Sequence, residues 1–318
     1  MELGVSYIPA HLPEHIKTDM HHLAEMGCTE VLFALQENHL HILTGALRFG
    51  APIAKAQGLR PYTVIWGFAN TFGGGRISKL MLDGTELWCQ TEESIPYAQA
   101  CLNNPKLAER FVELVALCRD HGYEGIFVDE PTKQECFCPH CREAFAAFAE
   151  RDLTASQGTP EYAAFRARTV RDYTAAVCQR VKELDPQLMT ITCVMPHDRD
   201  TWANVAAIPD LDVFGTDPYW LVSEGRMTLE QAVADAAEVK QICTEQGKRS
   251  QVWLNCWRIP AGREEEIYTG GRALAEVGCD SLYTWSYRGG LGTNEECDDP
   301  QRAWASVVRL YRELAGQG

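Results

Sequence analysis

The chain has 318 residues, of which 46% are hydrophobic and 23% charged, and this composition excludes collagen, coiled-coil and linker sequences in favour of an ordinary globular protein. Its 29 Lys and Arg against 44 Asp and Glu give a formal net charge of -15. Such a charge repels phosphate backbones and anionic lipid head groups, so we expect neither nucleic acid nor a membrane surface as a partner.

The first residues, Met1-Glu2-Leu3-Gly4, contain neither the basic nor the apolar region of a signal peptide, and no apolar run is long enough to span a bilayer. The 13 cysteines are an odd number, and several of them fall on apolar stretches: Cys118, Cys178, Cys193, Cys243, Cys256 and Cys279. Buried free cysteines behave as small hydrophobic residues, which fits a reducing compartment. We therefore expect a cytoplasmic protein, and leave open its assembly into a homo-oligomer.

Short apolar, β-branched runs alternate with longer segments of helical period, a pattern typical of parallel strands joined by helices. The expected strands are residues 3–8, 30–35, 60–66, 125–129, 188–194, 211–216, 250–255 and 281–285. The expected helices are residues 13–26, 41–57, 105–121, 160–184, 202–207, 228–245, 264–277 and 300–314. Eight such repeats predict a single-domain (β/α)8 TIM barrel over residues 1–318, with loop insertions and a cysteine knuckle within residues 67–146.

Polar and aromatic residues follow the predicted strands, at the end where barrel enzymes carry their active sites. In chain order these residues are Gln36, Glu37, Trp66, Asn70, Asp129, Glu130, His197, Asp198, Asp217, Tyr219, Trp220, Asn255, Trp257, Arg258, Trp285, Tyr287 and Arg288. Aromatic rings stack on sugar rings, while carboxylates and amides bind hydroxyl groups, so the set favours a small saccharide or glycoside as ligand. The alternative is that the aromatic residues only cap the barrel core.

Two acids, Asp129 and Glu130, end the apolar fourth strand. Because adjacent strand residues point to opposite sides, we expect only one of them to face the barrel axis. Burial near apolar rings raises the pKa of a carboxyl group, as a general acid requires. Asp217 ends the sixth strand, and two carboxylates that flank a bond are what glycoside hydrolysis needs. The alternatives are a loop or helix-cap role for the first two acids and a turn role for Asp217.

Three cysteines, Cys136, Cys138 and Cys141, lie within six residues, a spacing that suits one tetrahedral zinc ion. Cys101 and Cys89 are the candidates for a fourth ligand, and His140 is a weaker one. Four protein ligands leave no position for substrate, so such a zinc would be structural. Redox chemistry and inert packing are the alternatives for this cluster.

The segment from Cys101 to Phe145 resembles glycoside hydrolase family 42, the zinc-containing β-galactosidases. The similarity comprises Cys101-Leu-Asn-Asn-Pro105 before a helix, Val128-Asp129-Glu130 at the end of the strand, and Cys136-Phe-Cys138-Pro-His-Cys141 after it. The resemblance implies that Cys101 is the fourth zinc ligand and Glu130 the acid/base.

The chain departs from the family in two places that concern catalysis. The family has Asn where this chain has Asp129, and a nucleophilic Glu at the end of strand seven where this chain has Asn255-Cys256-Trp257. The resemblance thus implies a related barrel without β-galactosidase activity. The second carboxylate would then be Asp217 or Asp129. Another layout, that of retaining α-glycosidases, would use Asp129 as nucleophile and Asp217 as acid/base.

The preferred hypothesis is a glycosidase in which Glu130 protonates the departing oxygen, with Asp217 or Asp129 as its partner. A second hypothesis is a non-catalytic carbohydrate-binding barrel, because the strand-seven Glu is missing. A third is a metal-dependent sugar isomerase or lyase, for which His197 is the sequence support. Identity of the sugar and retention or inversion at the anomeric carbon are not encoded in these motifs.

Overall fold

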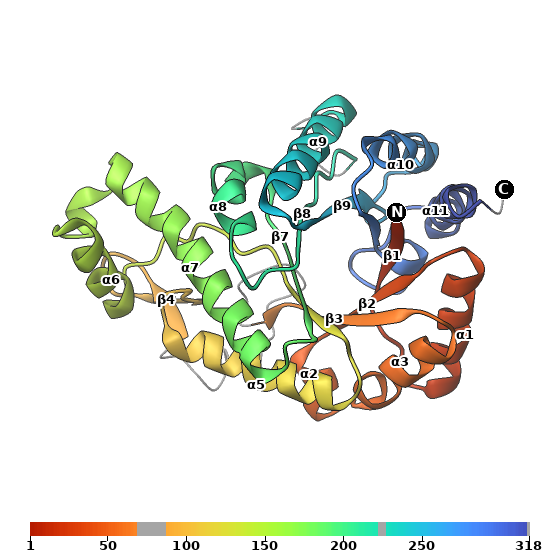
Figure 1. Ribbon diagram of the computed structural model, residues 1–318, viewed down its shortest axis with the longest axis horizontal. Coiled ribbons are helices and arrows are strands. Elements are labelled where there is room, and N and C mark those ends of the chain that lie inside the picture. Colours follow the sequence, from red (N-terminus) through yellow and green to blue (C-terminus); the bar gives the residue numbers. More distant parts are fainter. Residues whose placement is uncertain (69–86, 222–226, 317–318) are drawn as a thin grey trace.

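The computed structural model describes residues 1–68, 87–221 and 227–316, in which eight parallel strands close into a barrel surrounded by helices (Figure 1). The strands, in the order in which each pairs with the next, are β1 (Glu2–Tyr7), β2 (Glu30–Leu35), β3 (Arg60–Ile65), β6 (Gly125–Val128), β7 (Met189–Cys193), β8 (Val213–Thr216), β9 (Arg249–Asn255) and β10 (Ser281–Trp285). Strand β1 pairs with both β2 and β10, which closes the cylinder. The predicted (β/α)8 barrel is confirmed.

Helices connect successive strands and form the outer layer. They are α1 (Pro13–Glu25), α2 (Glu37–His41), α3 (Gly45–Ala56), α5 (Pro105–Asp120), α7 (Pro160–Leu184), α8 (Trp202–Ala206), α9 (Leu229–Gln246), α10 (Glu265–Val277) and α11 (Pro300–Leu314). Proline fills the first turn of α1, α5, α7 and α11, where no backbone donor is needed. Residues 41–57, expected as one helix, contain a break between α2 and α3.

Alternate residues of each strand serve two separate apolar cores. Inward-facing side chains such as Tyr62, Phe127 and Trp253 fill the barrel, while neighbours such as Phe33 and Val128 pack against the helices. At the amino-terminal end of the strands, Glu30 closes the barrel: its carboxylate accepts hydrogen bonds from Arg60 (2.6 Å) and Tyr283 (2.7 Å). The period of two along each strand therefore produces a packed apolar interior. Glu30 lies at its amino-terminal end, and the mouth of the barrel lies at the opposite end.

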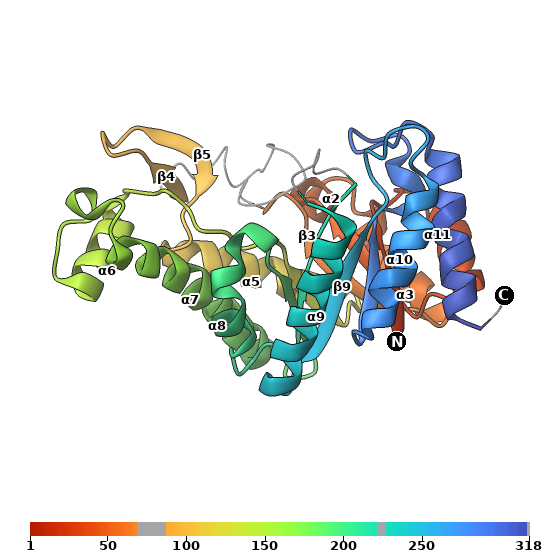
Figure 2. The ribbon, with the colours of Figure 1, turned by 90° about the horizontal axis from the view of Figure 1, so that it is seen from above.

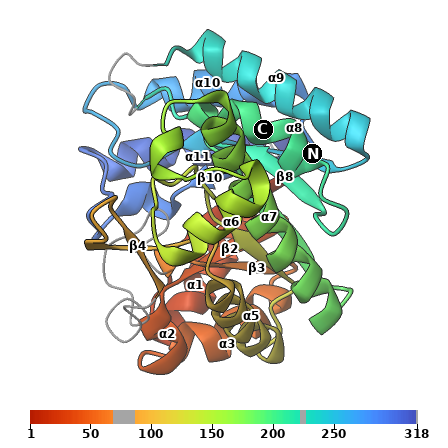
Figure 3. The ribbon, with the colours of Figure 1, turned by 90° about the vertical axis from the view of Figure 1, so that its left-hand side faces the viewer.

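A lobe beside the barrel contains the hairpin of β4 (Trp88–Gln90) and β5 (Pro96–Ala100) and the helix α6 (Pro139–Ala149). Figure 2 shows this lobe projecting from the side of the barrel, and Figure 3 looks directly onto it, with α6 in front and next to the long helix α7 that it contacts. Its core consists of cysteine and aromatic side chains, including Phe145 and Phe165. In the described part of the chain, no helix combines the length and apolar composition needed to cross a membrane.

Candidate active site

A cavity of ≈ 270 Å³ opens at the carboxyl ends of the strands. Its lining residues are Leu32, Trp66, Phe127, Asp129, Glu130, Cys193, Met195, Asp217, Tyr219, Trp253, Trp257, Arg258, Trp285 and Glu295. Seven of the residues expected from the sequence to bind or react with a ligand are among them: Trp66, Asp129, Glu130, Asp217, Tyr219, Trp257 and Trp285.

Both acids that follow β6 enter this cavity, so the expectation that only one of them faces the barrel axis is wrong. Strand β6 ends at Val128, and Glu130 has a backbone φ of 40°. Alternation of side chains holds only for extended backbone, and the left-handed residue turns the second carboxylate to the same side as the first. One carboxylate oxygen of Asp129, one of Glu130 and the Sγ of Cys193 lie within 4.8 Å of one another.

Asp217, directly after β8, is the most deeply buried acid of the cavity, with 1% of its surface exposed. Both of its carboxylate oxygens lack a hydrogen-bond donor among the described residues. Burial raises the pKa of Asp217 well above its usual range, and the negative charge of the adjacent Glu130 raises it further. The pKa of Asp129 is raised for the same two reasons, burial and Glu130. Asp129 and Asp217 therefore release their protons at a higher pH than exposed carboxyl groups do.

Aromatic rings form the walls around these acids. The Trp66 and Trp285 ring centroids are 5.3 Å apart, and Trp253 lies 6.3 Å from Trp285. On the other side, Tyr219 meets Trp257 edge to face at 5.7 Å. Burial and the charge of Asp217 raise the pKa of Tyr219, which keeps its hydroxyl neutral. Such walls present flat apolar faces to a ligand and exclude water from the carboxyl groups.

Four other residues expected to bind the ligand lie outside the cavity lining. Gln36 caps α2, and Glu37 is buried in the first turn of that helix. Trp220 packs against Gly270 of α10, where its ring occupies the space of a Cβ. The Oδ1 of Asn255 accepts from the Leu221 amide at 3.5 Å.

The remaining two expected residues are Tyr287 and Asn70. The Tyr287 hydroxyl donates to Asp19 at 2.8 Å, beside a separate cavity at the end of β1. Asn70 lies outside the described residues.

Six lining residues were not expected from the sequence, namely Leu32, Phe127, Cys193, Met195, Trp253 and Glu295. Phe127, Cys193 and Trp253 lie on the inward face of their strands, and the period of two would have selected them. Glu295 comes from the loop before α11 and pairs with Arg258 at 3.3 Å, a contact between distant segments that no local pattern reveals. This ion pair forms part of the rim, where the Arg258 guanidinium lies over the Trp257 ring.

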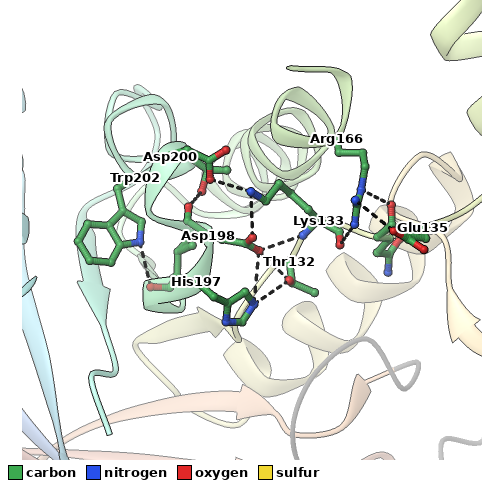
Figure 4. A network of polar contacts seen from close by, with 11 residues as sticks. Thr132, Lys133, Glu135, Arg166, His197, Asp198, Asp200 and Trp202 are labelled. Carbon is green, nitrogen blue, oxygen red and sulfur yellow. Dashed lines mark hydrogen bonds and ion pairs between the residues drawn. The ribbon is translucent and has the colours of Figure 1, made fainter. Parts of the chain in front are cut away.

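A polar network around the buried Asp198 fixes the loop that leaves β6 (Figure 4). The Oδ2 of Asp198 accepts from the Thr132 hydroxyl at 2.7 Å and from the Lys133 amide at 3.0 Å. The Lys133 ammonium lies 3.3 Å from Asp198 and 2.7 Å from Asp200. Burial opposes ionisation of Asp198, but these donors outweigh it and lower its pKa. His197 belongs to this network and its side chain is 63% exposed, outside the cavity lining.

Four buried cysteines, Cys101, Cys136, Cys138 and Cys141, place their sulfur atoms within 4.8 Å of one another. The Cys101 sulfur lies 3.3 Å from Cys141 and 3.5 Å from Cys138. A tetrahedral zinc with four thiolates separates the sulfur atoms by about 3.8 Å, so the cluster could hold such an ion. The Asn103 amide also donates to the Cys141 sulfur at 3.2 Å, a contact typical of the surroundings of metal ligands.

Of the two candidates for the fourth position, the geometry favours Cys101. Cys89 is buried beside the cluster and lies 3.7 Å from the Gln134 side-chain oxygen, outside the group of four. His140 is not part of the group either.

Comparison with known proteins relates the chain to glycoside hydrolases at the level of the fold. A β-galactosidase from Halorubrum lacusprofundi superposes with a TM-score of 0.76 at 17% identity, over 99% of this chain and 58% of that one. A GH42 β-galactosidase from G. stearothermophilus gives 0.75 at 14%, over 99% and 57%. An endo-β-1,4-mannanase from Thermotoga petrophila gives 0.64 at 12%, over 99% and 76%.

The chain spans between 56% and 59% of the length of the five β-galactosidase structures to which it is similar. No family model matches the sequence, and no curated protein matches it either. The structural similarity thus supports a glycoside hydrolase-like barrel, while the chemistry has to be argued from the cavity itself.

Proposed function

We propose that the protein is a glycoside hydrolase and that Glu130 and Asp217 are its catalytic pair. The observation that carries the proposal is the convergence of carboxyl groups from the fourth and sixth barrel strands in one aromatic-walled cavity. Trp66, Trp257 and Trp285 would stack on the sugar rings. The substrate class is a small saccharide or glycoside.

The electrostatics favour Asp217 as the proton donor. Two carboxyl groups in contact in a buried site share one proton, because both cannot ionise together at low cost. Asp217 is the more buried of the two and has no donor among the described residues to stabilise its charge. We assign to Glu130 the role of attacking the anomeric carbon, with Asp129 as a neighbouring acid that contacts the same cavity. This reverses the role that the resemblance to family 42 implies for Glu130.

The spacing of the acids supports retention of configuration. Inverting enzymes separate their carboxyl groups by roughly 6.5–9.5 Å to leave room for a water, whereas retaining enzymes bring them to about 5–5.5 Å. Here an oxygen of Asp129 lies within 4.8 Å of an oxygen of Glu130. We infer a similar closeness for Asp217, because Glu130 raises its pKa, and such a spacing favours retention.

A structural zinc ion at Cys101, Cys136, Cys138 and Cys141 is the second part of the proposal. Bound zinc would supply fixed geometry and no chemistry, since four thiolates complete its coordination. Helix α6 starts at the knuckle and packs on α7, so the four cysteines would hold the lobe together.

A panel of chromogenic aryl glycosides tests the catalytic roles. Glu130→Gln should lower kcat by about 10²–10⁴-fold for every substrate while leaving the fold and the metal content unchanged. Asp217→Asn should lose activity toward phenyl glycosides but keep a rapid first release of dinitrophenol from 2,4-dinitrophenyl glycosides, whose leaving group departs without a proton. Steady turnover should then return on addition of azide, which attacks the glycosyl-enzyme without a base. The control is Asp235→Asn, a buried acid of α9 that pairs with Arg199 outside the cavity, which should change turnover less than about twofold.

The outcomes separate the proposal from its rivals. Unchanged turnover in Glu130→Gln removes Glu130 from the mechanism. Saturable sugar binding without product at any pH would instead support the non-catalytic barrel, which the buried Asn255 in place of a strand-seven carboxylate favours. A metal-dependent isomerase has less support, because no histidine among the described residues lines the cavity.

A further inference from the structure

Glu130 adopts a backbone conformation that a residue with a side chain rarely keeps on its own. Its φ of 40° lies in the left-handed region, and such residues persist only where the surrounding structure holds them there. With an extended backbone, the side chains of Asp129 and Glu130 would point to opposite sides. The presence of both acids in one cavity therefore depends on the contacts that hold this turn.

On one side, Asp198 fixes the main chain that follows Glu130. Asp198 lies in the segment after β7, with 3% of its surface exposed. Its Oδ2 accepts from the Thr132 hydroxyl at 2.7 Å and from the Lys133 amide at 3.0 Å, and its Oδ1 lies 3.3 Å from the Lys133 ammonium. Because Thr132 and Lys133 come two and three positions after Glu130, these contacts leave the turn little freedom.

On the other side, Arg166 of α7 binds the same loop (Figure 4). Its Nη2 donates to the carbonyl oxygen of Lys133 at 2.7 Å, and its Nε donates to that of Gln134 at 2.9 Å. A planar guanidinium that donates to two successive carbonyl oxygens fixes their relative orientation, which a flexible ammonium group does less well. Lys133 is thus held at both its amide and its carbonyl group.

The far end of the loop is fixed to the lobe. The Gln134 side chain donates to the Ala100 carbonyl at 2.8 Å and accepts from the Leu102 amide at 3.0 Å. Neither Asp198 nor Arg166 belongs to the cavity lining, so their contacts with the loop do not serve to bind a ligand there.

We propose that Asp198 and Arg166 are positioning residues, which keep Glu130 in the cavity by holding residues 131–135 from two sides. The inference rests on the proposed function where it concerns turnover, because these two residues then place the nucleophile. Loss of either contact would let the turn relax toward extended backbone and carry the Glu130 carboxylate away from Asp217.

Asp217 provides a readout of the position of Glu130 that needs no substrate. The titratable groups that face Asp217 are Glu130, Asp129, Cys193 and Tyr219. Burial raises the pKa of Asp217, and the negative charge of Glu130 raises it further. Displacement of Glu130 should therefore lower this pKa, whereas a loss of stability alone should not change it.

The test compares Asp198→Ala and Arg166→Met with the wild type in the full chain. Turnover is measured with aryl glycosides, and the pKa of Asp217 by carbon NMR of protein labelled at the Asp carboxyl carbons, with Asp217→Asn to identify the signal. Each variant should lower kcat by about 10- to 100-fold and change KM less than about threefold, because a small misplacement of a reacting group is costly. The pKa of Asp217 should fall by about one pH unit.

Two controls separate positioning from general damage. Arg168→Met removes the same charge from α7, where Arg168 pairs with Asp172 at 3.0 Å, and should leave both kcat and the titration unchanged. Asp198→Asn retains one oxygen that can accept the two hydrogen bonds from the loop, so it should keep kcat within about threefold of the wild type.

Three results overturn the inference. The first is wild-type kcat and wild-type titration of Asp217 in Arg166→Met, and the second is an equal effect of Arg168→Met. The third is a lower kcat with an unchanged pKa of Asp217, because Glu130 would then still be in place. If Asp198→Ala does not fold, Arg166→Met decides, since it changes a partly exposed side chain of the outer helix layer.

Failure of the inference and failure of the proposed function can be told apart. If turnover depends on Glu130 but neither Asp198→Ala nor Arg166→Met changes it, the inference fails and the proposed function stands. If the wild type cleaves no glycoside, the proposed function fails, and the titration of Asp217 alone decides whether the two residues hold Glu130.

Discussion

Replacing Asp217 by Asn should make the protein more stable at neutral pH while it impairs catalysis. The folded state raises the pKa of Asp217 through burial and the charge of Glu130. For a carboxyl group with a raised pKa, folding is most favourable below the pKa in the unfolded chain, about 3.9, and stability is lost as the pH rises through the folded value. The neutral amide cannot ionise, so the variant avoids this loss.

The expected gain follows from the environment of Asp217. An unsatisfied buried polar group costs about 1–3 kcal/mol, and a charged one costs more. We therefore expect Asp217→Asn to raise the free energy of unfolding by about 1–3 kcal/mol at pH 8, with a gap that shrinks toward zero as the pH falls to about 4. Urea denaturation followed by circular dichroism at both pH values measures this difference.

Asp198→Asn is the matched comparison, because Asp198 is also a buried acid at a strand end but receives three donors. Its pKa is lowered, so its contribution to stability is present above the unfolded pKa and is lost as the pH falls through the lower folded value. This variant should be destabilised by about 2–4 kcal/mol at pH 8 and by less in acid. If Asp217→Asn is destabilised at pH 8 as Asp198→Asn is, then Asp217 is a satisfied structural carboxylate and the electrostatic reasoning is refuted.

Three further predictions concern the metal, the sugar platform and the barrel floor. Elemental analysis should find about one equivalent of zinc in the protein, less than half in Cys101→Ser, and full content in the control Cys89→Ser; equal zinc in both variants would exclude Cys101 as a ligand. Trp285→Ala should weaken sugar binding in calorimetry by about tenfold or more through loss of stacking, and an unchanged Kd would remove this ring from the platform. Gly4→Ala places a Cβ 2.3 Å from the Tyr283 ring, so urea denaturation should show a loss of about 1–3 kcal/mol; no loss would mean that the ring moves freely.

The barrel and the convergence of its acids could be predicted from the sequence because both depend on local patterns. Apolar β-branched runs identify buried parallel strands, and closure of eight of them brings all their carboxyl ends to one mouth. Asp129, Glu130 and Asp217 follow such runs directly, so their common location needed no further information.

The remaining features depend on backbone turns and distant contacts. The left-handed residue Glu130 turns its side chain to the same side as that of Asp129, which strand alternation does not anticipate. Trp220 also follows a strand end, yet the absence of a side chain at Gly270, 50 positions later, provides a site for its ring away from the cavity. The pairing of Glu295 with Arg258 likewise joins two loops that only the folded chain brings together.

The central claim, that Glu130 attacks the sugar, can be tested most directly by trapping the covalent intermediate. Incubation with a panel of dinitrophenyl 2-deoxy-2-fluoroglycosides, followed by peptide mapping in a mass spectrometer, identifies the residue that carries the sugar. The account predicts one sugar per chain, attached to Glu130, and no labelling in Glu130→Gln. A sugar attached to Asp129, Asp217 or any other residue, or release of dinitrophenol at equal rates by the wild type and Glu130→Gln, would contradict it.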